Sequence, residues 1–118
     1  MSSEQLLCRL EDLPEGQARG FDPGEHGWDT VFVVRQEGHL YAYRNTCPHA
    51  HGSRLSWQRD GYLSEDRRWI VCQAHGAQFD IATGLCLRGA AEGRSLESLP
   101  LRVDESGGVF LVSKQVPA

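Results

Sequence analysis

The chain has 118 residues, of which 40% are hydrophobic, and its 12 Lys and Arg against 16 Asp and Glu give a formal net charge of −4. This length fits a single domain, residues 1–118, that can bury a core of its own. The negative charge argues against a protein that wraps nucleic acid, because phosphate binding needs clustered Lys and Arg. No apolar run is long enough to span a membrane, and residues 1–10 lack the basic start and apolar centre of a signal peptide, so we expect a cytoplasmic protein.

Short strand patterns follow one another along the chain, and no segment has a sustained helical period. Glu37-Gly38 is a turn signal between the second and third of these patterns and predicts a hairpin. We expect strands at residues 6–10, 30–35, 40–43, 69–71, 78–81, 85–87, 99–103 and 109–112. The pattern predicts an all-β domain, either a sandwich or a small barrel.

Two short motifs, Cys47-Pro48-His49 and Cys72-Gln73-Ala74-His75, each offer one thiolate and one imidazole. Each motif is too tight for both of its side chains to bind one iron comfortably, but it suits one ligand on each of two neighbouring irons. A two-iron two-sulfur cluster with two Cys and two His ligands needs this set. Structural zinc is the alternative, although zinc fingers usually place their two cysteines together and their two histidines together.

The stretch from Arg44 to Leu87 contains Arg-Asn-Thr-Cys-Pro-His, Trp-Ile-Val-Cys-Gln-Ala-His-Gly-Ala-Gln-Phe-Asp and Thr-Gly-Leu-Cys-Leu. It resembles the soluble Rieske ferredoxins that serve bacterial ring-hydroxylating oxygenases. The resemblance implies an antiparallel base with an inserted cluster-binding subdomain at about residues 46–90. It also implies one [2Fe–2S] cluster, with Cys47 and Cys72 on one iron and His49 and His75 on the other.

By the same resemblance, the protein is an electron carrier and not an enzyme. It would take single electrons from an NAD(P)H-dependent reductase and pass them to a terminal oxygenase, such as an aromatic-ring-hydroxylating dioxygenase. Nothing in the sequence resembles a nucleophile with its base, a phosphate-binding glycine loop or the oxygenase's own non-haem iron site. A Rieske subunit bound permanently to a larger redox enzyme and, less favoured, a zinc-binding structural module are the alternatives.

The sequence departs from the high-potential Rieske proteins at the positions that tune the cluster. Ala77 and Phe79 stand where those proteins have a Ser and a Tyr whose hydroxyls donate to cluster sulfurs, and Gly52 and Ala74 stand where they have a disulfide. We therefore expect a low potential within the Rieske range of roughly −150 to +300 mV.

Two other departures concern the segments around the cluster. The 22 residues between His49 and Cys72 (72 − 49 − 1) exceed the usual spacing, and we expect a charged surface excursion there. Gly89-Ala90 replaces the usual Gly-Pro of a shielding loop, so shielding would be looser.

The other cysteines, histidines and tryptophans have simpler interpretations. Cys86 and Cys8 fit packed thiols on apolar strands, although a Cys72–Cys86 disulfide stays open. We expect His51 to lie in a loop near the site, His26 and His39 to be solvated, and Trp28, Trp57 and Trp69 to anchor the core or loops.

Overall fold

The computed structural model describes residues 3–47, 55, 60–72, 76–89 and 93–113. In this part of the chain, ten strands form three antiparallel sheets, joined by turns and one three-residue 3-10 helix. The expectation of an all-β fold is confirmed. No helix in the described ranges is long and apolar enough to cross a membrane.

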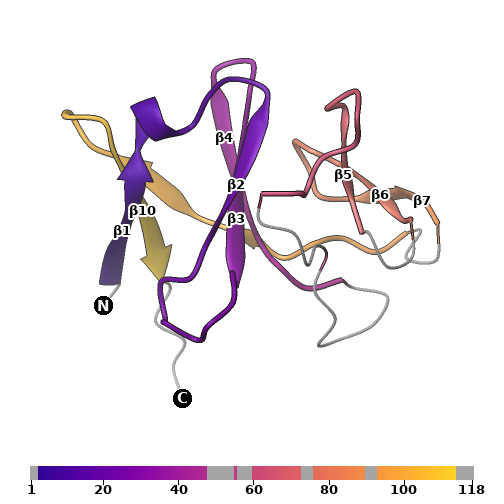
Figure 1. Ribbon diagram of the computed structural model, residues 1–118, viewed down its shortest axis with the longest axis horizontal. Helices are drawn as coiled ribbons and strands as arrows, with labels where there is room; N and C mark the ends of the chain where they lie inside the picture. The colour runs from indigo at the N-terminus through magenta and orange to yellow at the C-terminus, as the bar shows by residue number, and fades with distance from the viewer. Residues whose placement is uncertain (1–2, 48–54, 56–59, 73–75, 90–92, 114–118) are drawn as a thin grey trace.

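The first sheet brings the two ends of the chain together. Its strands are β1 (Ser3–Arg9), β10 (Gly108–Ser113) and β9 (Leu101–Val103), in the order β1-β10-β9. The 3-10 helix η1 (Leu10–Asp12) follows β1, and the Asp12 carboxylate accepts a hydrogen bond from the Arg9 N–H at 3.0 Å. The first and last strands of the described chain, β1 and β10, lie side by side in this sheet (Figure 1).

The second sheet contains the predicted hairpin. It has the order β2-β3-β4-β8, formed by β2 (Gln17–Phe21), β3 (Val31–Gln36), β4 (His39–Arg44) and β8 (Ser98–Leu99). Glu37 and Gly38 turn between β3 and β4 with φ values of 52° and 78°, as a two-residue hairpin loop of the primed type requires. The Glu15 carboxylate accepts hydrogen bonds from both of their N–H groups, at 2.5 and 2.9 Å.

Two features of these sheets differ from the expectation. The prediction of one strand over residues 99–103 is wrong, because Pro100 divides it into β8, which pairs with β4, and β9, which pairs with β10. Proline has no N–H to give to a strand ladder, and the chain changes sheet there. Strand β2 was not predicted. Its two buried positions are Ala18 and Gly20, and these small side chains give no visible alternation of apolar and polar residues.

The third sheet lies at the end of the molecule opposite the first sheet (Figure 1). It consists of β5 (Trp69–Val71), β6 (Gln78–Asp80) and β7 (Cys86–Arg88) in chain order. One residue of each strand, Ile70, Phe79 and Cys86, is buried. Since neighbouring strand residues point to opposite faces, these three define the inner face of the sheet.

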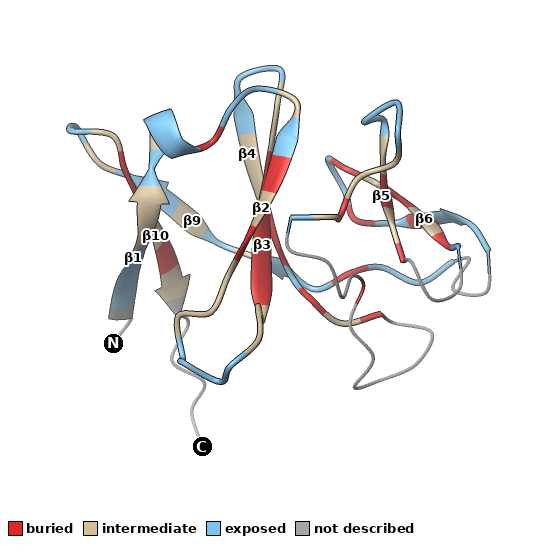
Figure 2. Ribbon diagram, viewed as in Figure 1, coloured by how far each residue is buried: buried red, intermediate tan, exposed pale blue. Residues whose placement is uncertain are grey.

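Strand β3 separates the two parts of the core (Figure 2). Phe32 and Val34 belong to the larger hydrophobic cluster, which the third sheet shares, while Val33 belongs to the smaller cluster beneath the first sheet. Successive side chains of a strand point to opposite faces, so β3 is buried on both. This is why its sequence, Val-Phe-Val-Val, is a continuous apolar run.

Candidate metal centre

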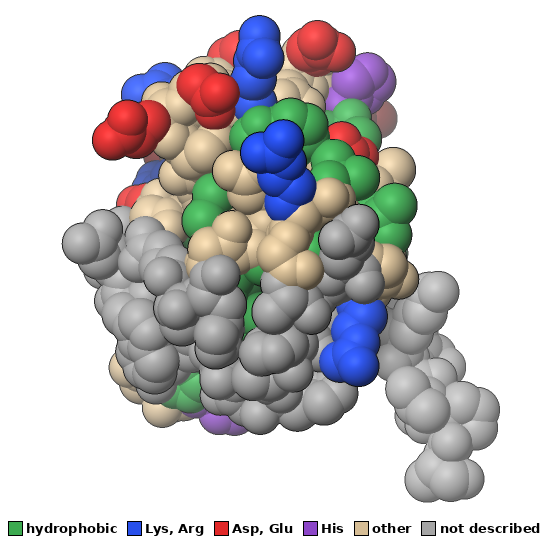
Figure 3. Space-filling view, turned by 90° about the vertical axis from the view of Figure 1, so that its right-hand side faces the viewer, with side chains coloured by type: hydrophobic (Ala, Val, Ile, Leu, Met, Phe, Trp, Pro, Cys, Tyr) green, Lys and Arg blue, Asp and Glu red, His purple; other side chains and the backbone are tan. Residues whose placement is uncertain are grey.

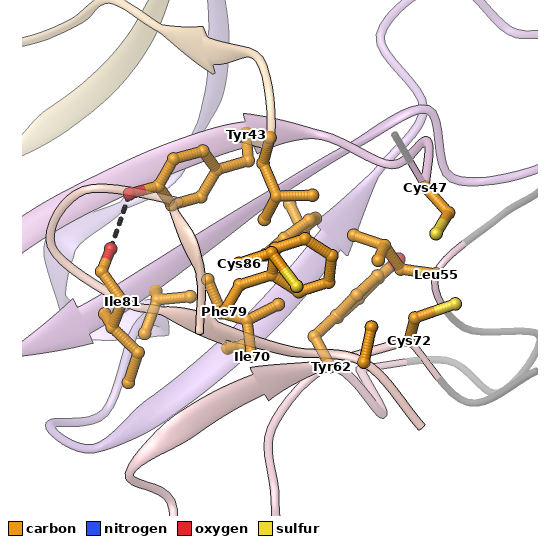
Figure 4. Packing of buried hydrophobic residues seen from close by; sticks show 14 residues of the cluster. Tyr43, Cys47, Leu55, Tyr62, Ile70, Cys72, Phe79, Ile81 and Cys86 are labelled. Carbon is orange, nitrogen blue, oxygen red and sulfur yellow. Dashed lines mark hydrogen bonds between the residues drawn. The ribbon is translucent and has the colours of Figure 1, made fainter. Parts of the chain in front are cut away.

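The two predicted cysteine ligands lie at the same end of the larger cluster (Figure 4). Cys47 follows the end of β4 by three residues, and Cys72 directly follows β5. Both side chains have an exposed fraction of 0%, and neither forms a disulfide. The fold thus gathers two reduced sulfur atoms in an apolar environment from motifs 25 residues apart (72 − 47).

Hydrogen bonds join the first residue of the second motif, Cys72, to the two residues that follow the motif. The Cys72 N–H donates to the Ala77 carbonyl at 2.9 Å, and the Gly76 N–H donates to the Cys72 carbonyl at 2.7 Å. Gly76 has a φ of 70°, a backbone conformation that glycine adopts without steric cost. These bonds hold Cys72, at the end of β5, next to Gly76 and Ala77, which precede β6.

Gly89, at the end of the segment that contains β7, packs closely against Ala77, which follows the second motif. A Cβ atom on Gly89 would come within 2.8 Å of the Ala77 Cα. Gly89 also has a φ of 102°, so glycine is required there for both space and backbone conformation. Ala77 and Phe79 are fully buried and carry no hydroxyl group.

The remaining cysteines are packed thiols, as predicted. Cys86 is buried, lies beside Phe79 in Figure 4 and donates from its Sγ to the Arg88 carbonyl at 3.1 Å. It forms no disulfide with Cys72. Cys8 is only half-buried, and this burial, with the nearby Asp12 carboxylate, raises the pKa of its thiol to about 11.

The histidines of the two motifs, His49 and His75, and the neighbouring His51 lie outside the described residues. Their predicted roles therefore stay predictions. His26 and His39 are exposed, as expected for solvated side chains. Within the ranges that the structure describes, no group of three or more His, Cys, Asp or Glu side chains is arranged to hold a metal ion.

The long segment between the motifs is only partly the surface excursion that we predicted. Its charged turn, residues 65–68, is exposed, and the Ser64 N–H closes it by donating to the Trp69 carbonyl at 2.9 Å. Tyr62, however, is 1% exposed and belongs to the larger cluster. Asp60 accepts a hydrogen bond from the Gly20 N–H of β2 at 2.8 Å, so the segment is anchored to the second sheet.

Asn45 is the residue of the site that the sequence analysis did not single out. It is 1% exposed and lies two residues before Cys47, and its Oδ1 accepts a hydrogen bond from the Leu55 N–H at 2.9 Å. Two features of the sequence could have indicated it: Asn45 is the sole asparagine of the chain, and it stands between a predicted strand and a Cys-x-His motif.

The fold and the site are those of a small antiparallel β protein with two buried cysteines, free of disulfides, whose thiolates are available as ligands to a metal centre. The Rieske [2Fe–2S] domain is the family whose model matches residues 3–101 of the chain. The chain belongs to the Rieske [2Fe–2S] domain family.

Relatives of known role are similar over most of their length. The ferredoxin component of the alkene monooxygenase system of Xanthobacter autotrophicus is 35% identical over 111 residues, covering 94% of this chain and 82% of that protein. The ferredoxin component of the naphthalene 1,2-dioxygenase system of Pseudomonas putida is 30% identical over 96 residues, covering 80% of this chain and 82% of that one.

Solved structures agree with the fold. The ferredoxin of carbazole 1,9a-dioxygenase from Nocardioides aromaticivorans superposes with a TM-score of 0.68 at 25% identity, covering 96% of this chain and 99% of that chain. A chain in the complex of reduced oxygenase and oxidized ferredoxin of carbazole 1,9a-dioxygenase reaches 0.71 at 24% identity, with 97% of each chain covered.

The cofactor of this family, a Rieske [2Fe–2S] cluster, needs two thiolates and two imidazoles, and the two described cysteines fit the thiolate half of this set. Cys47 and Cys72 are reduced, buried and at the same end of one apolar cluster. A hydrophobic shell controls the solvent access of a bound centre and so tunes its potential, and both cysteines belong to the larger hydrophobic cluster.

Proposed function

We propose that this protein is the ferredoxin of an oxygenase system, taking single electrons from an NAD(P)H-dependent reductase and delivering them to a terminal oxygenase. The observation that carries the proposal is the 35% identity to an alkene monooxygenase ferredoxin over 94% of this chain. A second relative serves a naphthalene dioxygenase system, so the shared partner is an oxygenase that takes electrons from a ferredoxin. The chain transfers electrons and transforms no substrate itself.

We propose that Cys47 and Cys72 bind one iron of the cluster and that His49 and His75 bind the other. The burial and reduced state of the two thiols support the first half of this assignment. The second half is supported by the motif spacing and by family membership. The bound cluster supplies a site that accepts and gives up one electron, and the protein's part is to hold, shield and expose it.

We also propose that residues 1–118 form one domain with its cluster-binding part at about residues 46–90. The separate third sheet, which runs from Trp69 to Arg88, supports this division. Four cysteines without a disulfide support a reducing compartment, and hence the cytoplasm.

We propose that partner proteins bind at the end of the molecule that carries the third sheet. Leu85 and Leu87 are 39% and 40% exposed there. Figure 3 looks on to this end and shows hydrophobic side chains next to basic ones. Such a mixed surface suits a transient contact with a partner. The alternative, a subunit bound permanently to a larger enzyme, is tested by size-exclusion chromatography, where a monomer would argue against it.

The test is the spectrum and metal content of anaerobically purified protein, before and after reduction with dithionite. The proposal predicts two irons per chain and the low-average-g electron paramagnetic resonance signal of a reduced Rieske cluster. A colourless protein with one zinc would overturn it. His49→Ala and His75→Ala are expected to abolish the signal, whereas His51→Ala, the matched control in the same segment, retains it.

Electron transfer is tested with the reductase of a naphthalene dioxygenase system as the probe. Reduction of the oxidised protein by NADH should depend on that reductase and should stop in His49→Ala. Reduction at an equal rate in a variant without the cluster would contradict the proposed role.

A further inference from the structure

Asn45 is the one polar or charged residue in the described part of the chain whose side chain is buried, with an exposed fraction of 1%. It stands between the end of β4 and Cys47. An amide side chain is costly to bury unless its hydrogen-bonding groups are satisfied. The burial of this amide close to a proposed cluster ligand therefore needs an explanation.

Both ends of the amide are used. Its Oδ1 accepts from the Leu55 N–H at 2.9 Å, and its Nδ2 donates to the Asp29 carbonyl at 2.7 Å. Nδ2 also lies 3.4 Å from the Tyr62 hydroxyl, and the backbone N–H of Asn45 donates to the Thr30 carbonyl at 2.8 Å. One side chain thus joins three separate segments of the chain.

The bond to Leu55 has a topological consequence. Asn45 and Leu55 are ten residues apart and bracket both Cys47 and His49. Their hydrogen bond fixes the two ends of this stretch next to each other, and the bond to the Asp29 carbonyl holds Asn45 beside the segment that precedes β3. A ligand-bearing loop restrained at both ends loses less conformational freedom when it binds a metal.

The absence of a side chain at Gly20 of β2 leaves space for Asp29 and Tyr62. A Cβ atom on Gly20 would come within 2.4 Å of Asp29 Oδ2 and 2.6 Å of the Tyr62 hydroxyl. These are two of the residues that the Asn45 amide contacts. Gly20 has no positive φ, so space rather than backbone conformation explains glycine at this position.

We infer that Asn45 is a positioning residue of the [2Fe–2S] centre, whose amide clasps the two ends of the first ligand loop and so sets the orientation of Cys47. The inference rests on the proposed function, in which Cys47 is an iron ligand. Asn45 itself touches no iron in this account. It acts through the loop that it closes.

Three variants test the role. Asn45→Leu keeps a side chain of similar volume but leaves the Leu55 N–H and the Asp29 carbonyl unpaired. Gly20→Ala places a Cβ atom against Asp29 Oδ2 and the Tyr62 hydroxyl, so it displaces two residues that contact the Asn45 amide without changing residues 45–55. Tyr43→Phe is the matched control, because it removes another buried side-chain hydrogen bond of the same hydrophobic cluster, from its hydroxyl to the Ile81 carbonyl at 2.5 Å.

The readouts are the g values of the dithionite-reduced protein, its midpoint potential and the rate of cluster loss at a fixed temperature. We expect Asn45→Leu to shift the g values and the potential and to lose its cluster about tenfold faster, since the buried Leu55 N–H and the part-buried Asp29 carbonyl lose their partner. Gly20→Ala should shift the same quantities in the same direction. Tyr43→Phe should lower stability while its g values and potential stay at the wild-type values.

Unaltered g values and potential in both Asn45→Leu and Gly20→Ala would overturn the inference, as would an equal shift in Tyr43→Phe. If Asn45→Leu binds no iron at all, Gly20→Ala decides by the same readouts. A wild-type protein without the Rieske signal overturns the proposed function and this inference together, whereas a wild-type signal with unaltered variants overturns this inference alone.

Discussion

Tyr62 lies face to face with Phe32, with ring centroids 4.3 Å apart and ring planes inclined by 7°. Phe32 is in the middle of β3, and Tyr62 belongs to the long segment between the two ligand motifs. Both rings are almost fully buried, at 0% and 1% exposed. The stack therefore anchors the additional length of that segment to the second sheet, and the segment contributes to the core that surrounds the cysteines.

Removing this stack should destabilise the whole domain. Truncation of a buried aromatic ring costs about 3–5 kcal/mol, and we expect this loss for Tyr62→Ala. Tyr62→Phe keeps the ring and removes the hydroxyl that makes the long contact with Asn45, so a smaller loss of about 1 kcal/mol is expected. Urea unfolding of the cluster-loaded protein, followed by tryptophan fluorescence, measures both values. Equal stability of Tyr62→Ala and the wild type would show that the ring does not stabilise the core.

A side chain at position 89 should destabilise the protein more than a side chain at position 93. Both have positive φ values, 102° and 86°, so a Cβ atom strains the backbone similarly at either position. At Gly89 the Cβ would also meet the Ala77 backbone at 2.8 Å, whereas at Gly93 it would meet nothing within 4 Å.

We therefore expect Gly89→Ala to be about 1–3 kcal/mol less stable than Gly93→Ala, since overpacking adds to the strain. Cluster absorbance during thermal unfolding measures the difference. Two variants with the same midpoint and the same rate of cluster loss would contradict the close packing of Gly89 on the second motif.

Ala77→Ser should raise the midpoint potential. By resemblance to the high-potential Rieske proteins, a hydroxyl at this position donates to a cluster sulfur and stabilises the more negative reduced state. Phe79→Tyr should act in the same direction. Ala82→Ser is the matched control, because Ala82 is exposed in the turn after β6. Protein-film voltammetry at pH 7 measures all of them, and a lower or unchanged potential in Ala77→Ser would count against the low-potential assignment.

Tyr43 should make stability fall at alkaline pH. Burial, with smaller contributions from Asp80 and Tyr41, raises the pKa of its phenol from 10.0 to about 12. A group whose pKa is higher in the folded state contributes stability below its unfolded pKa and loses it as pH rises through the folded value. The window is therefore roughly pH 10 to 12.

Tyr43→Phe should be less stable at neutral pH and should decline less steeply across that window. Cys8, whose pKa is also raised, keeps its own alkaline contribution in both proteins, so the difference between them isolates Tyr43. Urea unfolding at a series of pH values makes the comparison. Parallel stability curves for the two proteins from pH 10 to 12 would refute the assignment.

Local patterns predicted most of the fold. The run at β3, the Glu37-Gly38 turn and the short strands β5, β6 and β7 were all detectable, because alternation and turn chemistry act between residues that are close in sequence. Strand β2 and the division at Pro100 were not detected. Both depend on which sheet receives the strand, and that is decided by residues far away in sequence.

The candidate site shows the same division. The sequence alone determined the family and indicated the candidate ligand types and their pairing in two motifs, because the chemistry of a thiolate or an imidazole belongs to the residue itself. Only the tertiary structure decided that Tyr62 turns into the core, that Gly89 presses on Ala77 and that Asn45 joins Leu55 to Asp29. Burial and hydrogen-bond partnership depend on segments that fold together from distant parts of the chain, and no local pattern contains them.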